Sequence, residues 1–431
     1  MGFALCVQIS ALSWILNTKY GLNLEEIGNV WLAGPLAGIL GQVIVGVISD
    51  NVWFMGGRRR PFIVIGGLIA AAMIWALPNL GLISRAIGVE SIVAVAITVA
   101  LVLDLAINVG FNPARSIIAD VTPEGDVRTK GYTWMQTISG FFGVLAYVIA
   151  VVTSNYVLIY VGVGLVFVFS VIPPFFISEP RELDEGNAPD GVATQADLLE
   201  DGSDIRVQGG DAGTNQRRKG EKGKGNTSDW NAFLRICLAH AFTWVGVQCM
   251  FIYTFGFIKQ SIMGFDVNAE LSADLSNQIG ASIGIAFAIL NTIGFLFPAL
   301  VLEPVTRRIG RVKTHALALA VSAVGYLLIV FLGQSMFAFY ALMAVVGVGW
   351  AAIVSIPFAI MSEVVDQRKM GLMMGLFNLS VVLPQIVASR LGGVIETAAD
   401  KSIIFWIAAG TLAVSSGLWL LVKEPELGAR S

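Results

Sequence analysis

Four polar residues lie at helical spacing in an otherwise apolar stretch, and together they could bind a proton and hydroxyl groups. They occupy positions i, i+4, i+8 and i+11 of a segment that starts near Ser91, and are Asp104, Asn108, Asn112 and Arg115. A period of 3.6 residues puts them on one helical face. If that helix crosses a bilayer, a charge at its middle costs roughly 2.5–3.5 kcal/mol on insertion scales. The polar face must therefore point into a bundle interior or a wet cavity, and not towards lipid.

This polar face has two possible roles. It is either a structural seam that joins neighbouring helices or part of a substrate or ion pathway, the usual role of an ionisable residue inside a membrane. Burial disfavours the charged form of a carboxyl group, and Arg115 lies roughly 16 Å along the helix from Asp104, too far for direct contact. We therefore predict that Asp104 carries a coupled proton. Asn108, Asn112 and Arg115 are predicted to bind substrate, with Arg115 near the end of the helix and close to an inward gate.

The composition supports a membrane protein. Of the 431 residues, 56% are hydrophobic and only 13% are charged, with a mean hydropathy of +0.76, whereas soluble domains carry about 25% charged residues. The net charge is −3 and no basic domain is present, so we expect no nucleic-acid partner. The three cysteines show neither metal nor redox spacing, and we expect neither a metal site nor a cofactor.

Long apolar runs separated by short polar loops predict an all-α integral membrane protein with about twelve transmembrane helices. Their approximate limits are 2–17, 28–49, 61–80, 90–114, 132–153, 156–177, 231–258, 278–302, 313–333, 337–362, 370–394 and 402–422. The first run is short for a span, since about 20 residues are needed. We expect the native first helix to begin upstream of Met1.

Positive charges are distributed unevenly among the loops. Arginines and lysines cluster after the second, fourth, eighth and tenth apolar runs and are sparser in the loops between. The positive-inside rule then places both termini in the cytoplasm. We expect a monomeric, multi-pass protein embedded in the lipid bilayer of the plasma membrane, the inner membrane in a bacterium.

Residues 178–230 interrupt the helical pattern. This segment is acidic first and basic later, is rich in Gly, Asp and Asn, and lacks aromatic residues before Trp230. Such a composition cannot bury a core and predicts a disordered cytoplasmic linker. The linker separates an N-terminal six-helix bundle, residues 1–177, from a C-terminal six-helix bundle, residues 231–431.

The two predicted bundles share motifs in register. An arginine-rich loop follows the second run of each half, and a Glu-Pro pair follows the last run of each half, at Glu179 and Glu424. These matches indicate duplication of a six-helix unit. Such loops pair carboxylates, arginines and helix ends, which predicts a cytoplasmic gating motif, although the arginines could also serve orientation alone. The predicted gating residues are Asp50, Arg58, Arg59, Arg60, Asp120 and Glu363.

Three motifs resemble the sucrose-transporter branch of the major facilitator superfamily. They are Gly46-Val-Ile-Ser-Asp50 with Gly57-Arg-Arg-Arg-Pro-Phe-Ile63, Leu103-Asp104-x3-Asn108 with Pro113-x-Arg115-x3-Ala119-Asp120, and Gly371-Leu-Met-Met-Gly-Leu-Phe-Asn378 with Leu383-Pro384-Gln385. The resemblance covers nearly the whole chain outside the linker and implies the major facilitator fold. It also implies that Asp104 and Arg115 match the pair tied to proton-coupled sugar uptake in that family. Residues 251–259 lack the Arg-Glu pair of plant members and look more like bacterial relatives.

Further polar residues are predicted inside the spans. An amide both donates and accepts hydrogen bonds, as a sugar hydroxyl does, and Trp14, Trp134 and Trp244 could present flat faces to a pyranose ring. Few fixed charges at depth indicate a neutral ligand. Each amide could equally tie helices together, and His240 could relay protons or be a structural histidine. The other predicted substrate-binding residues are Gln8, Gln136, Trp244, Gln248, Asn291, Asn378 and Gln385.

We therefore expect a secondary active transporter that works by alternating access. It moves a proton together with a neutral sugar, either a sucrose- or maltose-like disaccharide or a glycoside. An exporter of the same fold and a sodium-coupled transporter of another small neutral solute are the alternatives. Sodium sites prefer several oxygen ligands around broken helices, whereas Asp104 is the clear carboxylate at depth. The sequence contains no His-Glu-x-x-His, Walker or Cys-x-x-Cys motif, so we do not expect an enzyme.

Overall fold

The computed structural model describes residues 2–38, 53–57, 59–121, 126–179, 229–365 and 370–423. Within the described helices, the structure does not describe the side chains at positions 112, 115, 116, 118–121, 126–137, 299, 362, 363, 370–372, 374 and 375. Seven of the predicted site residues therefore cannot be placed by their side chains: Asp50, Arg58, Asn112, Arg115, Asp120, Gln136 and Glu363.

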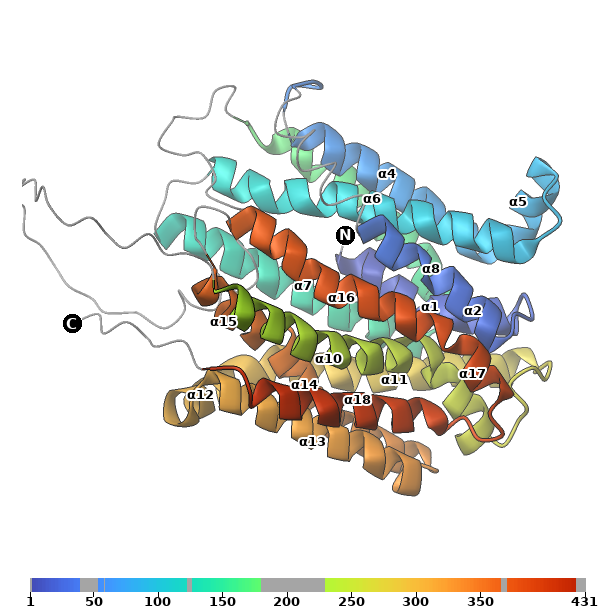
Figure 1. Ribbon diagram of the computed structural model, residues 1–431. Coiled ribbons are helices and arrows are strands. Elements are labelled where there is room, and N and C mark those ends of the chain that lie inside the picture. The colour runs from blue at the N-terminus through green and yellow to red at the C-terminus, as the bar shows by residue number, and fades with distance from the viewer. Residues whose placement is uncertain are drawn as a thin grey trace, which may run out of the picture.

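Helices make up nearly all of the described chain (Figure 1). The α-helices are α1 Gly2–Thr18, α2 Leu24–Trp31, α4 Arg60–Ala76, α5 Leu80–Ile87, α6 Ile92–Val121, α7 Asp126–Val152, α8 Asn155–Val171, α10 Trp230–Phe257, α11 Ala273–Phe297, α12 Glu303–Ile309, α13 Arg311–Leu332, α14 Met336–Ile353, α15 Ile356–Val364, α16 Met370–Arg390, α17 Gly392–Thr397 and α18 Ile403–Trp419. Short 3₁₀ turns form η1 Leu77–Asn79 and η2 Pro173–Phe176, and π-helical turns form η4 Ile258–Ile262 and η5 Pro298–Leu302.

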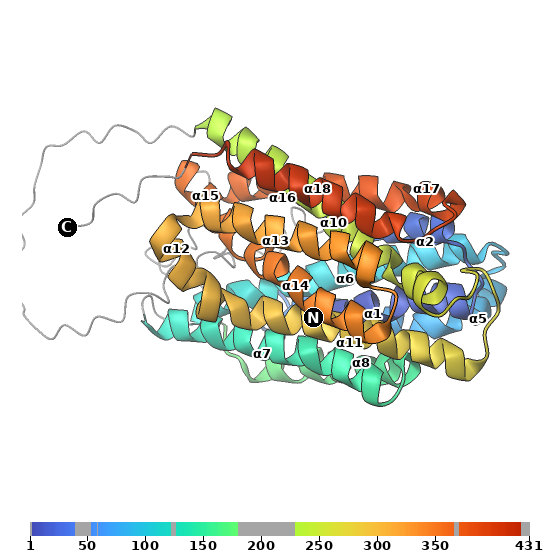
Figure 2. The ribbon, with the colours of Figure 1, turned by 90° about the horizontal axis from the view of Figure 1, so that it is seen from below.

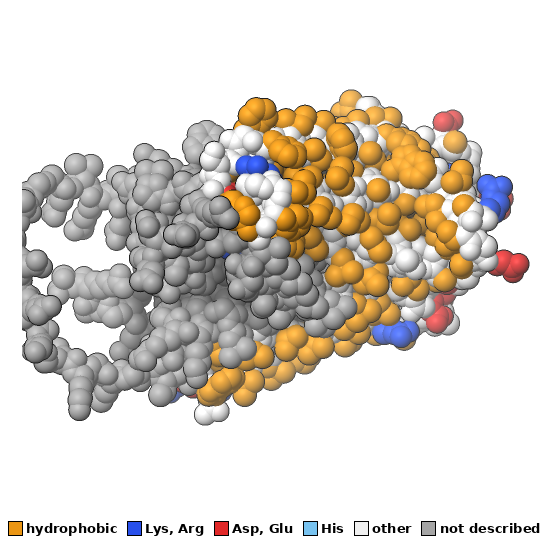
Figure 3. All heavy atoms as spheres, turned by 90° about the horizontal axis from the view of Figure 1, so that it is seen from above, with side chains coloured by type: hydrophobic (Ala, Val, Ile, Leu, Met, Phe, Trp, Pro, Cys, Tyr) orange, Lys and Arg blue, Asp and Glu red, His pale blue; other side chains and the backbone are white. Residues whose placement is uncertain are grey.

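Eight helical stretches among the described residues are long and apolar enough to cross a membrane. They include residues 92–111 of α6 and residues 230–262 of α10 and η4, and three shorter apolar helices accompany them. Apolar side chains cover the middle of the face seen in Figure 3, whereas most visible charged side chains gather at the end away from the undescribed residues. An apolar middle and a charged end fit a protein that crosses a bilayer. The helical architecture fits it too, because helices satisfy their backbone hydrogen bonds internally. The predicted all-α membrane architecture is confirmed.

The helices run roughly along one direction and form two groups, before and after residues 180–228 (Figures 1 and 2). In the first group, α4 packs against α6 and α8, and α1 packs against α7. In the second, α10 packs against α16 and α18, and α13 packs against α14 and α18. The groups meet where α7 contacts α11 and where α2 contacts α16 and α17. The division into two six-helix domains stays a prediction.

The bundle has two different ends. We call the end that carries Glu179 and Asp229 the linker end, and the opposite end, with the turns 19–23, 88–91 and 263–272, the far end (Figure 1). At the far end a capping box starts α2. The Asn23 side chain accepts from the Glu26 N–H at 2.9 Å, and the Glu26 carboxylate accepts from the Asn23 N–H at 2.9 Å.

Two glycines allow the groups to approach closely at the far end. A Cβ added to Gly28 of α2 would overlap the Ser389 carbonyl oxygen and the Tyr253 hydroxyl, and one added to Gly392 of α17 would lie 2.7 Å from the Leu24 carbonyl oxygen. The Tyr253 hydroxyl donates to the Ser389 carbonyl at 2.8 Å. Backbone from the two groups is therefore in direct contact here, without intervening side chains.

A buried lysine also joins the two groups at this end. Lys259 of η4 is 2% exposed, and its ammonium donates to Asn17 Oδ1 at 3.0 Å, the Val267 carbonyl at 2.7 Å and the Ala269 carbonyl at 2.8 Å. Three neutral oxygens thus use all three ammonium donors. Trp14 adds a further tie by donating its indole N–H to the Ser276 carbonyl at 2.6 Å. The far end is closed between the two groups.

We expect Gly28→Ala to separate α2 from α16 at the far end, because the added methyl overlaps two oxygen atoms that belong to other helices. Spin labels at Glu90→Cys and Glu270→Cys, in a background without the native cysteines, would measure the separation by double electron–electron resonance. The distance distribution should become longer or broader than in the parent.

The matched control is Gly164→Ala in α8, where an added Cβ meets no atom within 4 Å. It should leave the distribution unchanged. A Gly28→Ala distribution identical to that of the parent would show that glycine contact does not hold the far end closed.

Candidate functional site

The centre of the candidate site is a pair of buried side chains from α1 and α6. Gln8 Nε2 donates to Asp104 Oδ2 at 3.0 Å, and the two residues are 2% and 7% exposed. A Cβ at Gly34 would lie only 3.4 Å from the same carboxylate oxygen, so the segment 33–38 packs directly on the pair. Two predicted site residues from distant parts of the sequence are thus brought into contact.

Asp104 has no cationic partner among the described residues. Its side chain is bonded to Gln8 alone there, and no described lysine, arginine or histidine forms an ion pair with it. A buried carboxylate without a cation is costly, whereas a protonated carboxyl is neutral and requires only ordinary hydrogen-bond partners. This arrangement suits a group that gains and loses a proton better than a permanent salt bridge would.

Gln8 has one polar atom still available. Its Oε1 is buried and accepts no hydrogen bond from the described residues, although an amide oxygen can accept two. A buried acceptor left without a donor costs about 1–3 kcal/mol. A ligand hydroxyl that donates to Gln8 would remove this cost and would then be one amide group away from Asp104.

α6 runs without a break through the four residues that the periodicity placed on one face, even though Pro113 lies inside it. Asn108 Nδ2 donates to the backbone carbonyl of Asp104 at 2.8 Å, so part of its amide is used within its own helix. The side chains of Asn112 and Arg115 lie outside the described residues, and their substrate contacts stay predictions.

In the second group, an aromatic cluster surrounds His240 of α10. Trp244 donates its indole N–H to His240 Nε2 at 2.8 Å, and the imidazole stacks on Phe377 with a centroid distance of 4.9 Å. Trp350 approaches Trp244 edge to face at 6.2 Å. Because indole is only a donor, Nε2 acts as the acceptor of a neutral imidazole. The sequence alone offered both a relay and a structural role, and this contact favours the structural one.

The predicted amides differ in how they are used. The side chains of Gln248, 6% exposed, and of the partly buried Gln385 make no hydrogen bond to any described residue. Asn291 donates to the Phe287 carbonyl of its own helix at 2.9 Å, and the partly buried Asn378 has interactions of its own. The two glutamines therefore have the most hydrogen-bonding capacity left for a ligand.

Sequence reasoning missed Tyr147 of α7. Its ring is 1% exposed and packs on Phe287 at 6.2 Å, while its hydroxyl lies beside the Cys6 thiol and the Asn291 amide. It thereby connects α1, α7 and α11. A tyrosine in an apolar run is indistinguishable from a core aromatic, so no signal in the sequence identified it. The sequence also proposed Trp14 as a sugar-stacking face, but its indole N–H is bound at the far end.

At the linker end, Glu179 caps α4. Its carboxylate accepts from the backbone N–H of Arg59 at 2.7 Å and from that of Arg60 at 2.8 Å, and the Arg60 guanidinium bonds the Ile177 carbonyl. Unsatisfied N–H groups and the helix dipole make a helix N-terminus a favourable position for an anion. The predicted gating motif thus includes a carboxylate that the sequence identified only as part of a repeated Glu-Pro pair.

Similarity to known proteins identifies the family of this chain. The chain matches the model of the Major Facilitator Superfamily over residues 1–300 and again over 271–431. The chain belongs to the Major Facilitator Superfamily. The structure of this chain resembles the crystal structure of the nucleoside transporter NupG. The TM-score is 0.63, and the sequences are 14% identical over 98% of this chain and 96% of that one. A variant of the peptide transporter POT gives a TM-score of 0.65 and 16% identity over 98% and 91%.

Related sequences include sugar transporters. Sucrose transport protein SUC4 of Arabidopsis thaliana is 23% identical over 434 residues, covering 90% of this chain and 80% of that protein. The general alpha-glucoside permease of Schizosaccharomyces pombe is 33% identical over 153 residues, covering 32% and 27%. These relatives are consistent with the sucrose-transporter branch indicated by the motifs. The chain is a membrane transporter of the superfamily and not an enzyme, as predicted.

We expect Glu179→Gln to destabilise the protein by about 1–2 kcal/mol, because it removes the negative charge that caps α4 while keeping the side-chain shape. The midpoint of thermal unfolding in detergent should fall. Glu303→Gln is the control, since Glu303 forms an exposed ion pair with Arg307 within one helix, and such pairs contribute about 0.5 kcal/mol or less. Equal midpoints for the two variants would contradict the capping role.

Proposed function

We propose that this transporter is a symporter of protons and a neutral sugar, a disaccharide or a glycoside, with Asp104 as the proton-coupling group. The observation that carries the proposal is the buried contact between Asp104 and Gln8, with no described cation near the carboxyl and a free acceptor on the amide. The names of the relatives, sucrose transport proteins and an alpha-glucoside permease, support sugar as the substrate class.

In the proposed mechanism, Gln8 connects the proton to the sugar. One edge of the amide contacts Asp104 and the other presents Oε1 to a sugar hydroxyl. When Asp104 is protonated, the site is neutral and stable without a cation. When the proton leaves, the negative carboxylate accepts a stronger hydrogen bond from the Gln8 N–H. The stronger bond polarises the amide, and with it the Oε1 atom that contacts the sugar. Sugar affinity therefore depends on the protonation of Asp104.

The closed far end supports alternating access. With both termini in the cytoplasm, as the loop charges predict, the far end is extracellular, and the structure is then the state that is closed to the outside. The two six-helix domains, joined through residues 178–230, would rock about the central site. Of the three hydrogen bonds that hold Lys259, only the one to Asn17 crosses between the groups, so opening exchanges one hydrogen bond to a neutral amide for one to water.

Both domains contribute to the proposed sugar site. Gln248 and Gln385 have free hydrogen-bonding capacity, and the partly buried Trp244 adds an aromatic side chain of the kind that packs on an apolar sugar face. A few amides and aromatic faces suit a polyol without net charge. We assign the remaining substrate contacts to Asn108, Asn112, Arg115, Gln136, Asn291 and Asn378, and the cytoplasmic gate to Asp50, Arg58, Arg59, Arg60, Asp120 and Glu363.

We expect Asp104→Asn to abolish accumulation of sugar driven by a pH gradient while leaving sugar–sugar exchange partly intact, because asparagine resembles the protonated acid in size and charge. Uptake of a radiolabelled disaccharide panel into vesicles with an imposed pH gradient measures the first, and counterflow measures the second. The control is Asp274→Asn, at the exposed start of α11, which should transport like the parent.

Accumulation by Asp104→Asn against a concentration gradient would refute the coupling role of this residue. If the parent accumulates no member of the panel under a pH gradient, the proton-coupled sugar assignment itself is wrong, and an exporter or a sodium-coupled transporter takes its place.

We expect Gln8→Leu to raise the KM for sugar by roughly tenfold, the effect of losing one hydrogen bond in a buried site. The pH dependence of the remaining uptake should also change, because Asp104 loses its partner. Gln278→Leu, an exposed glutamine of α11, provides the control. An unchanged KM together with an unchanged pH profile would exclude Gln8 as the connection between sugar and proton.

A further inference from the structure

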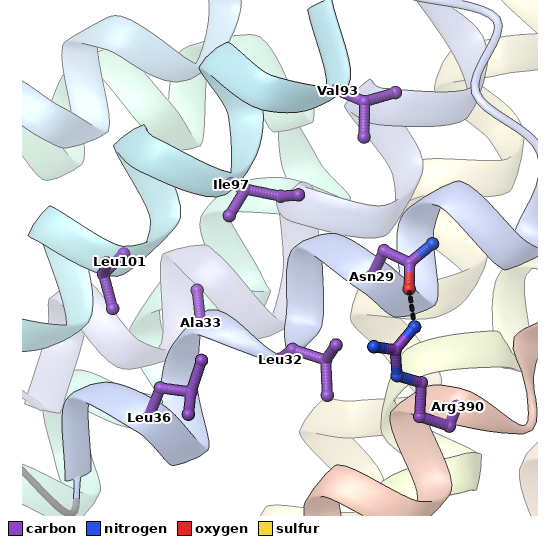
Figure 4. Close-up of a pocket in the computed structure, with 8 residues that line it drawn as sticks. All are labelled: Asn29, Leu32, Ala33, Leu36, Val93, Ile97, Leu101 and Arg390. Atoms are coloured by element: carbon purple, nitrogen blue, oxygen red, sulfur yellow. Dashed lines mark hydrogen bonds between the residues drawn. The ribbon is translucent and has the colours of Figure 1, made fainter.

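A groove at the far end lies between the two groups of helices (Figure 4), and none of its lining residues belongs to the predicted sugar site. Its volume is about 310 Å³, and its walls come from α2 with the segment 33–38, from α6 and from α16. The lining is apolar except at one end. The lining residues are Asn29, Leu32, Ala33, Leu36, Val93, Ile97, Leu101 and Arg390.

The groove faces the lipid and starts at the membrane surface. Val93 and Leu101 both line it and both belong to a candidate span, residues 92–111. Eight residues of helix correspond to roughly 12 Å, so the groove extends about that far from the far end into the hydrocarbon region. Leu36 is 47% exposed, which shows that the groove is open at the side of the molecule. Its natural filling is therefore a hydrocarbon chain and not water.

The polar end of the groove is cationic. Arg390, in the last turn of α16, donates one N–H to Asn29 Oδ1 at 3.0 Å. A guanidinium has five N–H donors, and this is its only hydrogen bond to the described residues, none of whose carboxylates forms an ion pair with it. Arg390 is exposed and is the last residue of α16, near the far-end limit of the candidate span 376–397. A phosphate ester at that level is the anion that the planar fork of donors fits.

We propose that the groove binds one phospholipid, with the headgroup phosphate on Arg390 and one acyl chain along Leu32, Ile97 and Leu101. The groove is complete only while α2 and α6 of one group lie beside α16 of the other. The bound lipid therefore stabilises the closed far end by binding that state in preference to an open one. This inference concerns the lipid interface and holds whatever solute the transporter moves.

Native mass spectrometry of the detergent-solubilised protein, titrated with dioleoylphosphatidylglycerol, tests the proposal. The parent should retain one lipid tightly, and Arg390→Gln should weaken that binding by roughly tenfold, the loss of a charge-assisted contact. Arg85→Gln is the matched control. Arg85 is exposed in the last turn of α5 at the same end and bonds the Gly81 carbonyl of its own helix at 3.1 Å, but it does not line the groove.

A second variant tests the chain-binding part without touching Arg390. Ile97→Trp fills the groove and should also displace the lipid, whereas Val161→Trp, an exposed apolar position on α8, should retain it. Equal retention by the parent and Arg390→Gln would overturn the proposal. So would loss from Arg85→Gln as large as that from Arg390→Gln, since the lipid would then be bound non-specifically. Retention by Ile97→Trp would overturn it too, because a phosphate would then bind the arginine without using the groove.

Discussion

A carboxyl group buried in an apolar bundle, with no cation beside it among the described residues, is the constraint on which the rest of this transporter depends. Asp104 can be present at this depth only if neighbouring helices supply polar contact and exclude lipid. Gln8 supplies the contact, and the absence of a side chain at Gly34 lets a third segment cover the pair. The Gln8–Asp104 hydrogen bond thus joins α1 to α6 through side chains, although α1 packs mainly against α7 and α8.

The far end meets a different requirement of the proposed mechanism, which is to close tightly and yet be able to open. Glycines bring backbone against backbone, as at Gly28, and such contacts separate without exposing large side chains. Lys259 is bonded to neutral oxygens and not to a carboxylate. A buried ion pair would leave an uncompensated charge when broken, but separating the groups breaks only the bond from Lys259 to the Asn17 amide and leaves the two carbonyl bonds within the second group.

The sequence predicted the helices well and their partners poorly, for a physical reason. Hydropathy and period depend on residues near in sequence, so α16 and α18 begin within one residue of their predicted limits, at Met370 and Ile403. α2 begins at Leu24, four residues before its predicted limit of 28, because its polar first turn hides it from hydropathy while Asn23 caps it. The contact of Gln8 with Asp104, and that of Glu179 with α4, join residues about 100 positions apart. No local pattern encodes which of several buried amides or carboxylates finds which partner.

The cost of burying an unpaired charge explains why an amide, and not a second charge, is suited to lie beside Asp104. A lysine there would hold the aspartate as an ion pair, and protonating the carboxylate would then leave the buried ammonium without its counter-charge, which is costly. An apolar residue would leave the carboxyl without a hydrogen-bond partner and would not connect it to the proposed sugar site. Gln8 donates to the carboxyl in either protonation state and still has an acceptor left over, whose cost of about 1–3 kcal/mol when unpaired favours a bound hydroxyl. A difference of this size corresponds to a roughly five- to 150-fold change in affinity, enough to couple two ligands without locking either in place.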